Sequence, residues 1–501
     1  MGAVLVEREH PAPVEATADP RRWLALAIVS IAQLMVILDA TIVNIALPQA
    51  QHALQIADAD RSWVLTAYTL TFGGLLLLGG RIADYWGRKR TFLLGLTGFA
   101  MASALGGFAS NGETLFAARA LQGAFGALLA PASLALLTVL FVEPRERARA
   151  FGVYGAIAGG GAAVGLVLGG VLTEYLDWRW CLLVNVPIAL VAGLAALFGL
   201  RESRAGGRTS YDVGGAVLIT LGLAGLVYGF TQAADPDYGW AHIYTLTFIV
   251  VSLLFLAGFV VVEFYTERPL LPLRILLERS RGGAFITSLL AGAGIFGASL
   301  FMTFYFQEVL VYTPVEAGLA TLPITAGVLL AFPFAASLLT RWGGRPLMAV
   351  GSFVAAGGLL LFTRIGIEDT FWSTVLPAEL VLGLGLGLIF VPLSNIALTG
   401  VNHADAGAAS AVVSASQQVG SSLGVAAMSA VALQAGTAYA ERHLPTSPEQ
   451  MMTFVSEVKV HSYQVGFAWG AAFLAVAGLV VLVLVRTGRL AKPAGAMIHL
   501  G

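Results

Sequence analysis

The stretch Leu34-Met-Val-Ile-Leu-Asp-Ala-Thr-Ile-Val-Asn-Ile-Ala-Leu-Pro48 lies inside an apolar run from Leu24 to Leu47. About 20 apolar residues are enough for a helix to cross a bilayer, so this run predicts a membrane helix. Asp39 is its one charged residue. A carboxylate at the centre of a membrane helix costs about 2.5–3.5 kcal/mol to insert, and chains that carry one generally use it. Asp39 is therefore either a functional proton-binding group or a structural carboxylate held by a hydrogen bond between helices.

Composition indicates that the whole chain is an integral membrane protein. Of its 501 residues, 57% are hydrophobic and only 11% are charged, whereas soluble domains are about 25% charged. Cys181 is the single cysteine, which excludes an intramolecular disulfide. The seven histidines lack metal-ligand spacing, and no nucleotide-binding Gly-Lys-Ser/Thr loop occurs. We expect no enzymatic activity, no metal or other cofactor, no use of ATP and no nucleic-acid partner.

Fourteen apolar runs of helix length predict an all-α membrane protein with fourteen transmembrane helices. They lie at about 24–47, 62–80, 91–110, 114–140, 150–173, 180–200, 213–232, 243–263, 284–309, 316–339, 346–365, 374–398, 407–435 and 465–486. The predicted parts are a tail at 1–23, a six-helix bundle at 24–200, two additional helices with linkers at 201–283, a second six-helix bundle at 284–490 and a tail at 491–501. The longest gap, 436–464, is predicted to be an outer loop.

The positive charges predict the orientation. If both termini are cytoplasmic, the inner segments hold 22 of the 28 Lys and Arg residues, the outer segments hold 5, and Arg119 alone lies within the membrane. This asymmetry is what the positive-inside rule requires. We therefore expect a multi-pass protein of the inner (plasma) membrane with both termini in the cytoplasm.

A turn rich in glycine and charge follows the second predicted helix, and its main members are Gly80, Asp84, Gly87, Arg88 and Lys89. A related turn, Arg341-Trp-Gly-Gly-Arg-Pro346, follows the second helix of the last six. Glycine permits a tight turn, and Asp84 can pair with a neighbouring cation. Inner positive charge alone would explain the Arg and Lys residues but not the glycines and the acid. The repeat suggests two related bundles, as in many transporters.

Two other helices carry unusual residues. Arg119 in the fourth helix is at a depth similar to that of Asp39, counted at 1.5 Å per residue. A buried guanidinium needs an acceptor, and Asp39 is a candidate. The fifth helix is glycine-rich, which allows close helix approach or bending, although ordinary packing would also explain it. Its main glycines are Gly152, Gly161, Gly165, Gly169 and Gly170.

Together these motifs resemble the major facilitator superfamily, specifically its fourteen-helix drug:proton antiporter branch, over residues 24–490. The segment from Leu38 to Pro48 resembles that branch's first-helix signature, and Arg119 with Gly123 resembles the fourth-helix signature. Two positions depart from the family pattern. Tyr85 stands where the loop signature has a basic residue, and Leu166 stands where the fifth-helix signature has proline.

The resemblance implies alternating access of two bundles around a central cavity, and we expect Asp39 and Arg119 to couple export to protons. Glu308 and Glu379 could bind a second proton or a cationic drug, although an interfacial position would also explain each. The cavity candidates are Gln33, Thr41, Asn44, Trp63, Tyr68, Gln122, Phe301, Tyr305 and Gln307; for each aromatic residue a core position is the alternative. Asp39 lies roughly opposite Gln33, Thr41 and Asn44 on the helix, so the face that lines the cavity stays open.

These observations predict a proton-coupled multidrug or antibiotic exporter, with the proton moving in and the drug moving out. The expected partners are the lipid bilayer and amphipathic small molecules, with cationic compounds among the candidates, and the expected oligomeric state is a monomer. The alternative is a lipid or metabolite transporter of the same fold. A polytopic membrane enzyme would need a cluster of His, Asp or Cys at one membrane face, which the sequence lacks.

Overall fold

The computed structural model describes residues 21–141, 143–204, 212–234, 238–266, 269–270, 273–399, 401, 406–445 and 447–486. Within these residues the first bundle consists of α1 (Arg22–Leu54), α2 (Trp63–Trp86), α3 (Arg88–Gly107), α4 (Gly112–Leu140), α5 (Pro144–Tyr175), α6 (Trp180–Leu183) and α7 (Asn185–Gly199). Next come α8 (Val213–Ala234), α9 (Ile243–Tyr265) and the short α10 (Leu273–Leu276). The second bundle consists of α11 (Arg279–Phe304), the π-helix η1 (Tyr305–Val309), α12 (Pro314–Ala320), α13 (Leu322–Trp342), α14 (Gly344–Phe362), the π-helix η2 (Phe371–Val375), α15 (Leu376–Leu398), α16 (Ala406–Arg442) and α17 (Pro448–Leu484).

The described helices confirm the predicted all-α architecture of fourteen membrane helices. Thirteen segments are long and apolar enough to cross a membrane, with α6–α7, α11–η1, α12–α13 and η2–α15 each counting as one. The fourteenth is α3, whose 20 residues include three basic residues at its start. It packs between α4 and α7 as a full member of the first bundle.

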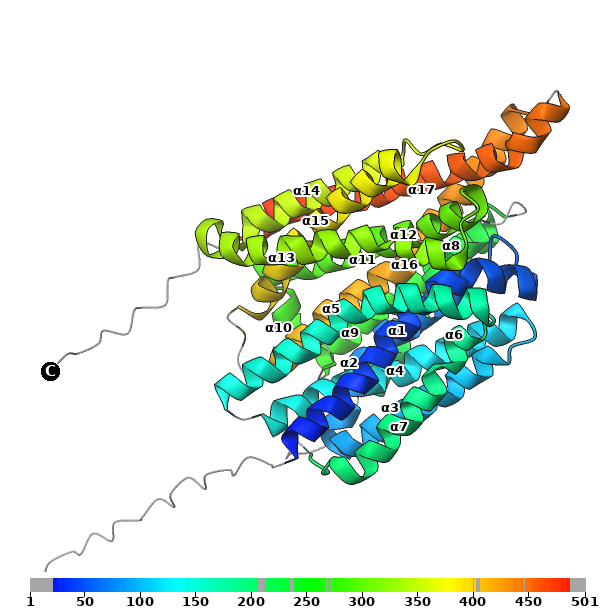
Figure 1. Cartoon of the computed structure of the whole chain (residues 1–501). Coiled ribbons are helices and arrows are strands. Elements are labelled where there is room, and N and C mark those ends of the chain that lie inside the picture. The colour runs from blue at the N-terminus through cyan, green and yellow to red at the C-terminus, as the bar shows by residue number, and fades with distance from the viewer. Residues whose placement is uncertain are drawn as a thin grey trace, which may run out of the picture.

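The two bundles share one packing plan (Figure 1). In the first bundle α4 packs on α2 and α3, and α1 packs on α5. In the second bundle α15 packs on α13 and α14, and α11 packs on α16. Their related turns also match, because Gly87 (φ 127°) between α2 and α3 and Gly343 (φ 85°) between α13 and α14 both adopt positive φ. Positive φ favours glycine, which explains why the turn recurs in the sequence.

Helix ends gather on two faces of the molecule. Arg22 at the start of α1 pairs with Glu146 at the start of α5 at 2.8 Å, and Lys89 Nζ at the start of α3 donates to Leu200 O, just after α7, at 2.8 Å. We call the face at which α1 begins the proximal face and the opposite one the distal face. The two bundles approach one another towards the distal face and diverge towards the proximal face (Figure 1).

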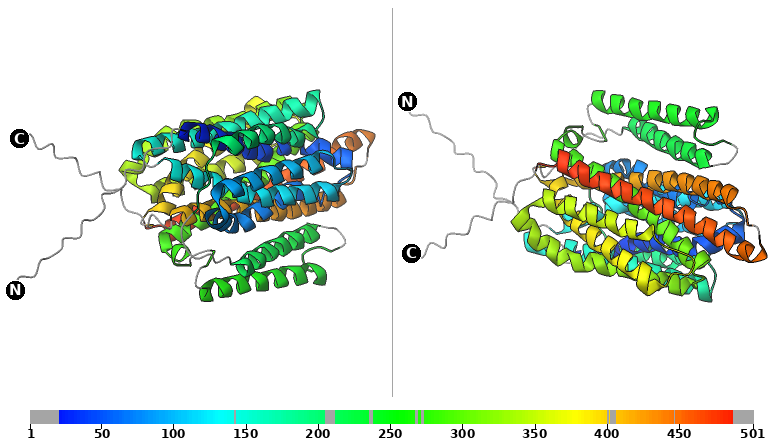
Figure 2. Two further views of the ribbon diagram at one scale, coloured as in Figure 1. Left: turned by 90° about the horizontal axis from the view of Figure 1, so that it is seen from below. Right: turned by 90° about the horizontal axis from the view of Figure 1, so that it is seen from above.

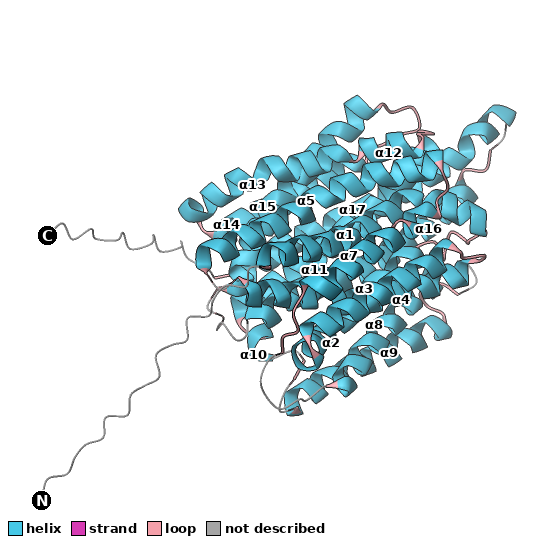
Figure 3. Ribbon diagram, turned by 60° about the horizontal axis from the view of Figure 1, so that its bottom comes forward, coloured by secondary structure: helices cyan, strands magenta, loops and turns pink. Residues whose placement is uncertain are grey.

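The inserted helices α8 and α9 form a separate layer at one edge of the molecule (Figures 2 and 3). α9 packs on α8, and α8 packs on α2 of the first bundle and α16 of the second. A small apolar cluster of Leu70, Leu223, Val227 and Ala426 joins these three helices. The pair therefore covers the seam between the bundles on one side.

The prediction that residues 436–464 form a loop is wrong, because most of this segment is helical. α16 continues to Arg442 and α17 begins at Pro448, so the two form a helical hairpin that projects past the other distal ends (Figure 1). Apolar length indicates where a helix leaves lipid, but a polar helix can continue in water when its partner helix accompanies it. Position 166 is leucine where the fifth-helix signature has proline, and α5 runs unbroken from Pro144 to Tyr175.

Candidate functional site

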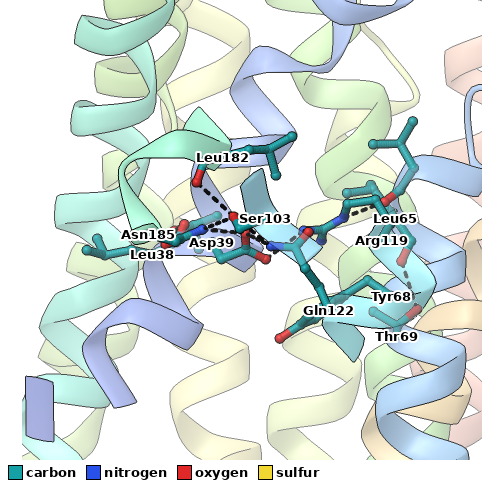
Figure 4. Close-up of polar contacts among 12 residues, drawn as sticks. Leu38, Asp39, Leu65, Tyr68, Thr69, Ser103, Arg119, Gln122, Leu182 and Asn185 are labelled. Atoms are coloured by element: carbon teal, nitrogen blue, oxygen red, sulfur yellow. Dashed lines mark hydrogen bonds and ion pairs between the residues drawn. The ribbon is translucent and has the colours of Figure 1, made fainter. Parts of the chain in front are cut away.

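Asp39 and Arg119 form a fully buried ion pair inside the first bundle. Their side chains are 0% and 1% exposed, and Arg119 Nη1 lies 2.6 Å from Asp39 Oδ2 (Figure 4). Arg119 Nε also donates to Val64 O at 3.0 Å. The similar depths of the two residues in α1 and α4 thus bring them into contact. A buried pair loses much hydration energy, so its remaining hydrogen-bonding capacity must be met by neighbours.

The second carboxylate oxygen is held by amides from two helices. Gln122 Nε2 and Asn185 Nδ2 each donate to Asp39 Oδ1 at 2.8 Å. Both amides also donate to Ser103 Oγ, at 3.0 and 2.9 Å, and Ser103 Oγ in turn donates to Leu182 O at 2.7 Å. We call these residues, with Arg119, the Asp39 network (Figure 4).

Hydrogen-bond donors surround the Asp39 carboxylate on every side that the described residues form. The carboxylate accepts from one guanidinium and two amides. The Arg119 guanidinium carbon lies 4.4 Å from the centroid of the Tyr68 ring, which adds a cation–π contact. The network therefore ties α1 to α4 and α7 through one buried acid.

Sequence reasoning did not find Asn185 and Ser103. Both are fully buried polar residues in otherwise apolar segments, α7 and α3. Their isolation among apolar residues was the available signal. The partner of each, however, depends on how its helix is rotated, which the sequence does not specify.

Several predicted cavity residues are instead buried in the bundles. Gln122 belongs to the Asp39 network and Tyr68 packs on Arg119, with exposures of 0% and 2%. Phe301 stacks on Tyr463, and Tyr305 donates from its hydroxyl to Gly366 O at 2.9 Å. These four side chains are buried inside the bundles in this conformation, and for the three aromatic residues this agrees with the alternative of a core position.

Other predicted cavity residues also make specific contacts. Trp63 faces the inserted pair, with its ring centroid 6.5 Å from that of Tyr228. Gln33 accepts from the Tyr154 hydroxyl at 2.5 Å. Thr41 donates to carbonyl oxygens of its own helix, at 2.9 and 3.1 Å. Trp63 is therefore also wrongly assigned to a central cavity.

Polar contacts between the two bundles lie towards the distal face. Asn44 Nδ2 donates to Ser299 Oγ at 2.6 Å, and Gln307 Nε2 donates to Ile45 O at 2.9 Å. Two predicted cavity residues, Asn44 and Gln307, thus close the space between α1 and the end of α11. Val315 N also donates to the Glu174 carboxylate at 3.0 Å.

Glu308 is at the centre of a charged contact at the same face. Its carboxylate lies 2.6 Å from Lys459 Nζ and 3.9 Å from His52 Nε2 of the opposite bundle. Nearby, the Arg61 guanidinium lies 4.1 Å above the ring of Phe304. These contacts give Glu308 a role in closing the distal side, in place of an unpaired interfacial position.

The glycines of α5 divide into two groups. Side chains at Gly161, Gly165, Gly169 and Gly170 would collide with α1 or with α12. At Gly152, by contrast, no atom lies within 4 Å of where a Cβ would be. The four glycines nearer the distal face therefore allow close approach of neighbouring helices, as one interpretation of the sequence expects. Gly152 does not, because α5 has open space around Gly152 near the proximal face.

The charged turn after α2 ties α2 and α3 to the end of α7. Arg88 Nη2 pairs with Asp84 Oδ1 at 2.9 Å, as the spacing predicts. Glu202 accepts from the backbone N–H groups of Lys89 and Arg90, both at 3.2 Å. A Cβ on Gly87 would lie 2.6 Å from the Glu202 carboxylate, so this turn requires glycine. Gly80 faces Pro131 of α4 at an ordinary contact distance of 3.6 Å.

Glu379 is fully buried, in the first turn of α15, and its binding of a proton or drug stays a prediction. Its side chain is 0% exposed. Neither carboxylate oxygen has a hydrogen-bond partner among the residues that the structure describes. The same part of the chain contains no group of three or more His, Cys, Asp or Glu residues that could hold a metal.

A groove of about 350 Å³ lies between the proximal halves of α1 and α5. Seven of its eight lining residues are apolar, and the eighth is Ser30, whose buried hydroxyl has no partner among the described groups. Its lining residues are Trp23, Leu26, Ala27, Ser30, Ile31, Leu34, Val153 and Ile157. Such a surface suits the apolar part of an amphipathic molecule.

Two helical bundles with related turns, joined at one face and with a buried ion pair inside the first, have the architecture of a secondary transporter. The model of the Major Facilitator Superfamily matches residues 29–425, and the chain belongs to this family. It is 46% identical over 480 residues to the puromycin resistance protein pur8 of Streptomyces alboniger, covering 94% of each chain. It is 38% identical to the cephamycin export protein CmcT of Amycolatopsis lactamdurans, covering 81% of this chain and 84% of that protein.

A solved structure shares the fold. A bacterial homologue of the human lysosomal transporter Spinster superposes with a TM-score of 0.64, over 93% of this chain and 98% of that one. The two sequences are only 14% identical. The likeness therefore concerns the architecture, and it supports the expected major facilitator fold.

Proposed function

We propose that this protein exports amphipathic antibiotics or related drugs in exchange for protons, by alternating access. The single observation that carries the proposal is the sealed Asp39 network, in which an acid inside a membrane helix is paired with a guanidinium from another helix. Relatives named for antibiotic resistance and export support the direction and kind of cargo.

In this mechanism the described conformation is the one that has delivered its proton. The positive-inside rule makes the proximal face cytoplasmic, and the distal contacts close the outside. Asp39 is then ionised and paired with Arg119. When the distal side opens, α1 moves with respect to α4, Arg119 withdraws and Asp39 binds a proton from outside. Each proton supplies about 2.3 kcal/mol per 100 mV of membrane potential and about 1.4 kcal/mol per pH unit.

The cargo is proposed to reach the protein from the cytoplasmic side, where α5 has open space and the apolar groove lies beside α1. The groove's lining offers burial of apolar surface but few hydrogen bonds, which favours broad selectivity for amphipathic compounds. A lipid could use the same surface. Parallel assays with puromycin, ethidium and a fluorescent phospholipid would distinguish the exporter from a lipid carrier.

The test uses Asp39→Asn in proteoliposomes with an imposed pH gradient. Asn keeps the size of the side chain but removes the counter-charge of the buried Arg119, so the folding of the variant is first verified by size-exclusion chromatography. We expect gradient-driven puromycin and ethidium transport to be lost in the folded variant. Cargo binding without a gradient should remain. The matched control is Ser133→Ala, which removes a buried hydroxyl that donates to Leu129 O at 2.8 Å, outside the Asp39 network. Gradient-driven transport by Asp39→Asn at the wild-type rate would refute the assignment.

A further inference from the structure

Glu379 is the one carboxyl group of α15, and it lies at the position in the second bundle that Arg119 occupies in the first. Gly123 lets α4 pack against the backbone of α2, and Gly383 lets α15 pack against the backbone of α13. Arg119 precedes Gly123 by four residues, and Glu379 precedes Gly383 by four residues. The repeat therefore places an acid where the related bundle has a base.

The second bundle has no counterpart of Asp39. In α5, Gly165 and Gly169 pack against α1, and Gly169 lies against Ile42. In α16, Gly420 and Gly424 pack against α11 in the same way, and Gly424 lies against Ala293. Asp39 lies three residues before Ile42 in α1, and Leu290 lies three residues before Ala293 in α11, so Leu290 is at the position that corresponds to Asp39. The buried pair of the first bundle is thus replaced by an acid without a base.

The elements packed against α15 supply no charge for Glu379. α15 packs on α11, α13, α14, α16 and η2, whose charged residues lie at helix ends. At the proximal ends these are Arg279, Arg281, Arg341 and Arg345, and at the distal tip of α16 they are Glu441 and Arg442. No described residue forms a hydrogen bond with Glu379. A carboxylate buried without a partner is strongly disfavoured, and such a group takes up a proton instead.

The segment that covers this side of α15 also closes the distal face. Gly383 of α15 lies against Ile324 of α13, and Gly318 of α12 lies against Leu166 of α5 in the opposite bundle. Since α12 leads directly into α13, we expect separation of α12 from α5 to displace the start of α13, the part of that helix that packs against α15. Exposure of Glu379 would then change with opening of the distal side.

We infer that Glu379 is a second proton-binding site, occupied in the distal-closed state, and that its protonation favours closure of the outer side. The inference rests on the proposed alternating access, but it concerns a different residue and bundle from the Asp39 network. Because a buried acid must be neutral and a solvated one can ionise, acid outside the cell shifts the population towards the closed state.

Two measurements test this inference. The first is infrared spectroscopy of the purified full chain at neutral pH. We expect the carbonyl stretch of a protonated, buried carboxyl group, which is lost in Glu379→Gln and kept in Asp39→Asn. A spectrum of Glu379→Gln identical to that of the wild type would overturn the proposal. Glu379→Leu serves the same purpose if the Gln variant is not recovered, because it also removes the acid without adding charge.

The second measurement is labelling from outside of a cysteine introduced by Val315→Cys in a Cys181→Ser background. Val315 faces α5 in the distal contact, so its labelling reports opening. We expect lowering the external pH from 8 to 6 to slow labelling several-fold in this parent. In Glu379→Gln, labelling should be slow at both pH values. The control Glu113→Gln alters an exposed acid in the first turn of α4 and should behave as the parent does.

Equal pH dependence in the parent and in Glu379→Gln would overturn the inference. Loss of gradient-driven transport in Asp39→Asn is a separate result. The proposed proton-coupled export can therefore be supported by Asp39→Asn while the proposal for Glu379 fails. Equally, the Glu379 measurements can succeed while transport by Asp39→Asn refutes the proposed coupling.

Discussion

At the scale of single residues, the Asp39 network explains why an acid is tolerated inside a membrane helix. Asp39 is sealed from solvent yet accepts hydrogen bonds from Arg119, Gln122 and Asn185. Removing one partner of a buried charge leaves the other with an uncompensated desolvation cost. Each hydrogen bond of the network should therefore contribute to the stability of the buried pair and, under the proposed function, to export.

The amide of Asn185 offers a graded test. In Asn185→Ala, Asp39 loses one of its donors, which costs about 1–3 kcal/mol for a buried polar group. Loss of this donor weakens the network around the carboxylate, so we expect gradient-driven export to fall several-fold while the protein still folds. Export rates of the reconstituted variant and wild type measure the change. Equal export by wild type, Asn185→Ala and the Ser133→Ala control would show that the Asn185 amide does not support export.

Sequence predicted the two ends of the ion pair but not its surroundings. Charge inside apolar helices identified Asp39 and Arg119, and their depths were consistent with contact. The predicted cavity set was largely wrong because depth and residue type do not fix the rotation of a helix. Tyr68 and Gln122 turned out to face inward within their own bundle, and Asn185 was overlooked for the same reason.

At the scale of secondary-structure elements, α5 divides into a packed distal half and an open proximal half. Gly170 lies against the backbone of α12, where a Cβ would be 2.6 Å from Pro314 O. Backbone cannot move aside as a flexible side chain can. The distal half of α5 is therefore a close contact between bundles, while Gly152 in the proximal half has open space.

This difference predicts opposite outcomes for two matched substitutions. Gly170→Ala should prevent full distal closure, so export should fall at least several-fold and labelling of Val315→Cys from outside should rise. Gly152→Ala should leave export near wild type and stabilise the helix by about 1 kcal/mol, since alanine favours helix over glycine. Paired export and labelling assays of the two variants measure this. Equal export by both variants would contradict the division of α5.

At the scale of the whole molecule, transport requires the bundles to separate at the distal face. The two bundles, their shared turn and the inserted pair could all be predicted, because apolar length, charge asymmetry and glycine spacing act locally along the chain. The conformation could not be predicted, since it depends on contacts between residues far apart in sequence. Asn44 with Ser299 is one such contact, across 255 positions.

That contact can be locked chemically. In a Cys181→Ser background, the pair Asn44→Cys and Ser299→Cys places two thiols where side-chain atoms now lie 2.6 Å apart. We expect oxidation to form a disulfide and abolish export, and reduction to restore it. The control is Thr173→Cys with the native Cys181 retained, a pair whose side-chain atoms lie 3.2 Å apart and join α5 to α6 within one bundle; its cross-link should leave export largely intact. Undiminished export with a complete Asn44–Ser299 cross-link would rule out movement at this seam.

The helical hairpin formed by the ends of α16 and α17 has a practical consequence. It projects past the other distal ends as a rigid, folded feature (Figure 1), on a protein that otherwise exposes short connections there. With the distal face outside the cell, as proposed, an antibody fragment raised against this tip would bind intact cells without touching the seam between the bundles. Such a fragment would also add the asymmetric mass that small membrane proteins need for particle alignment in electron cryomicroscopy.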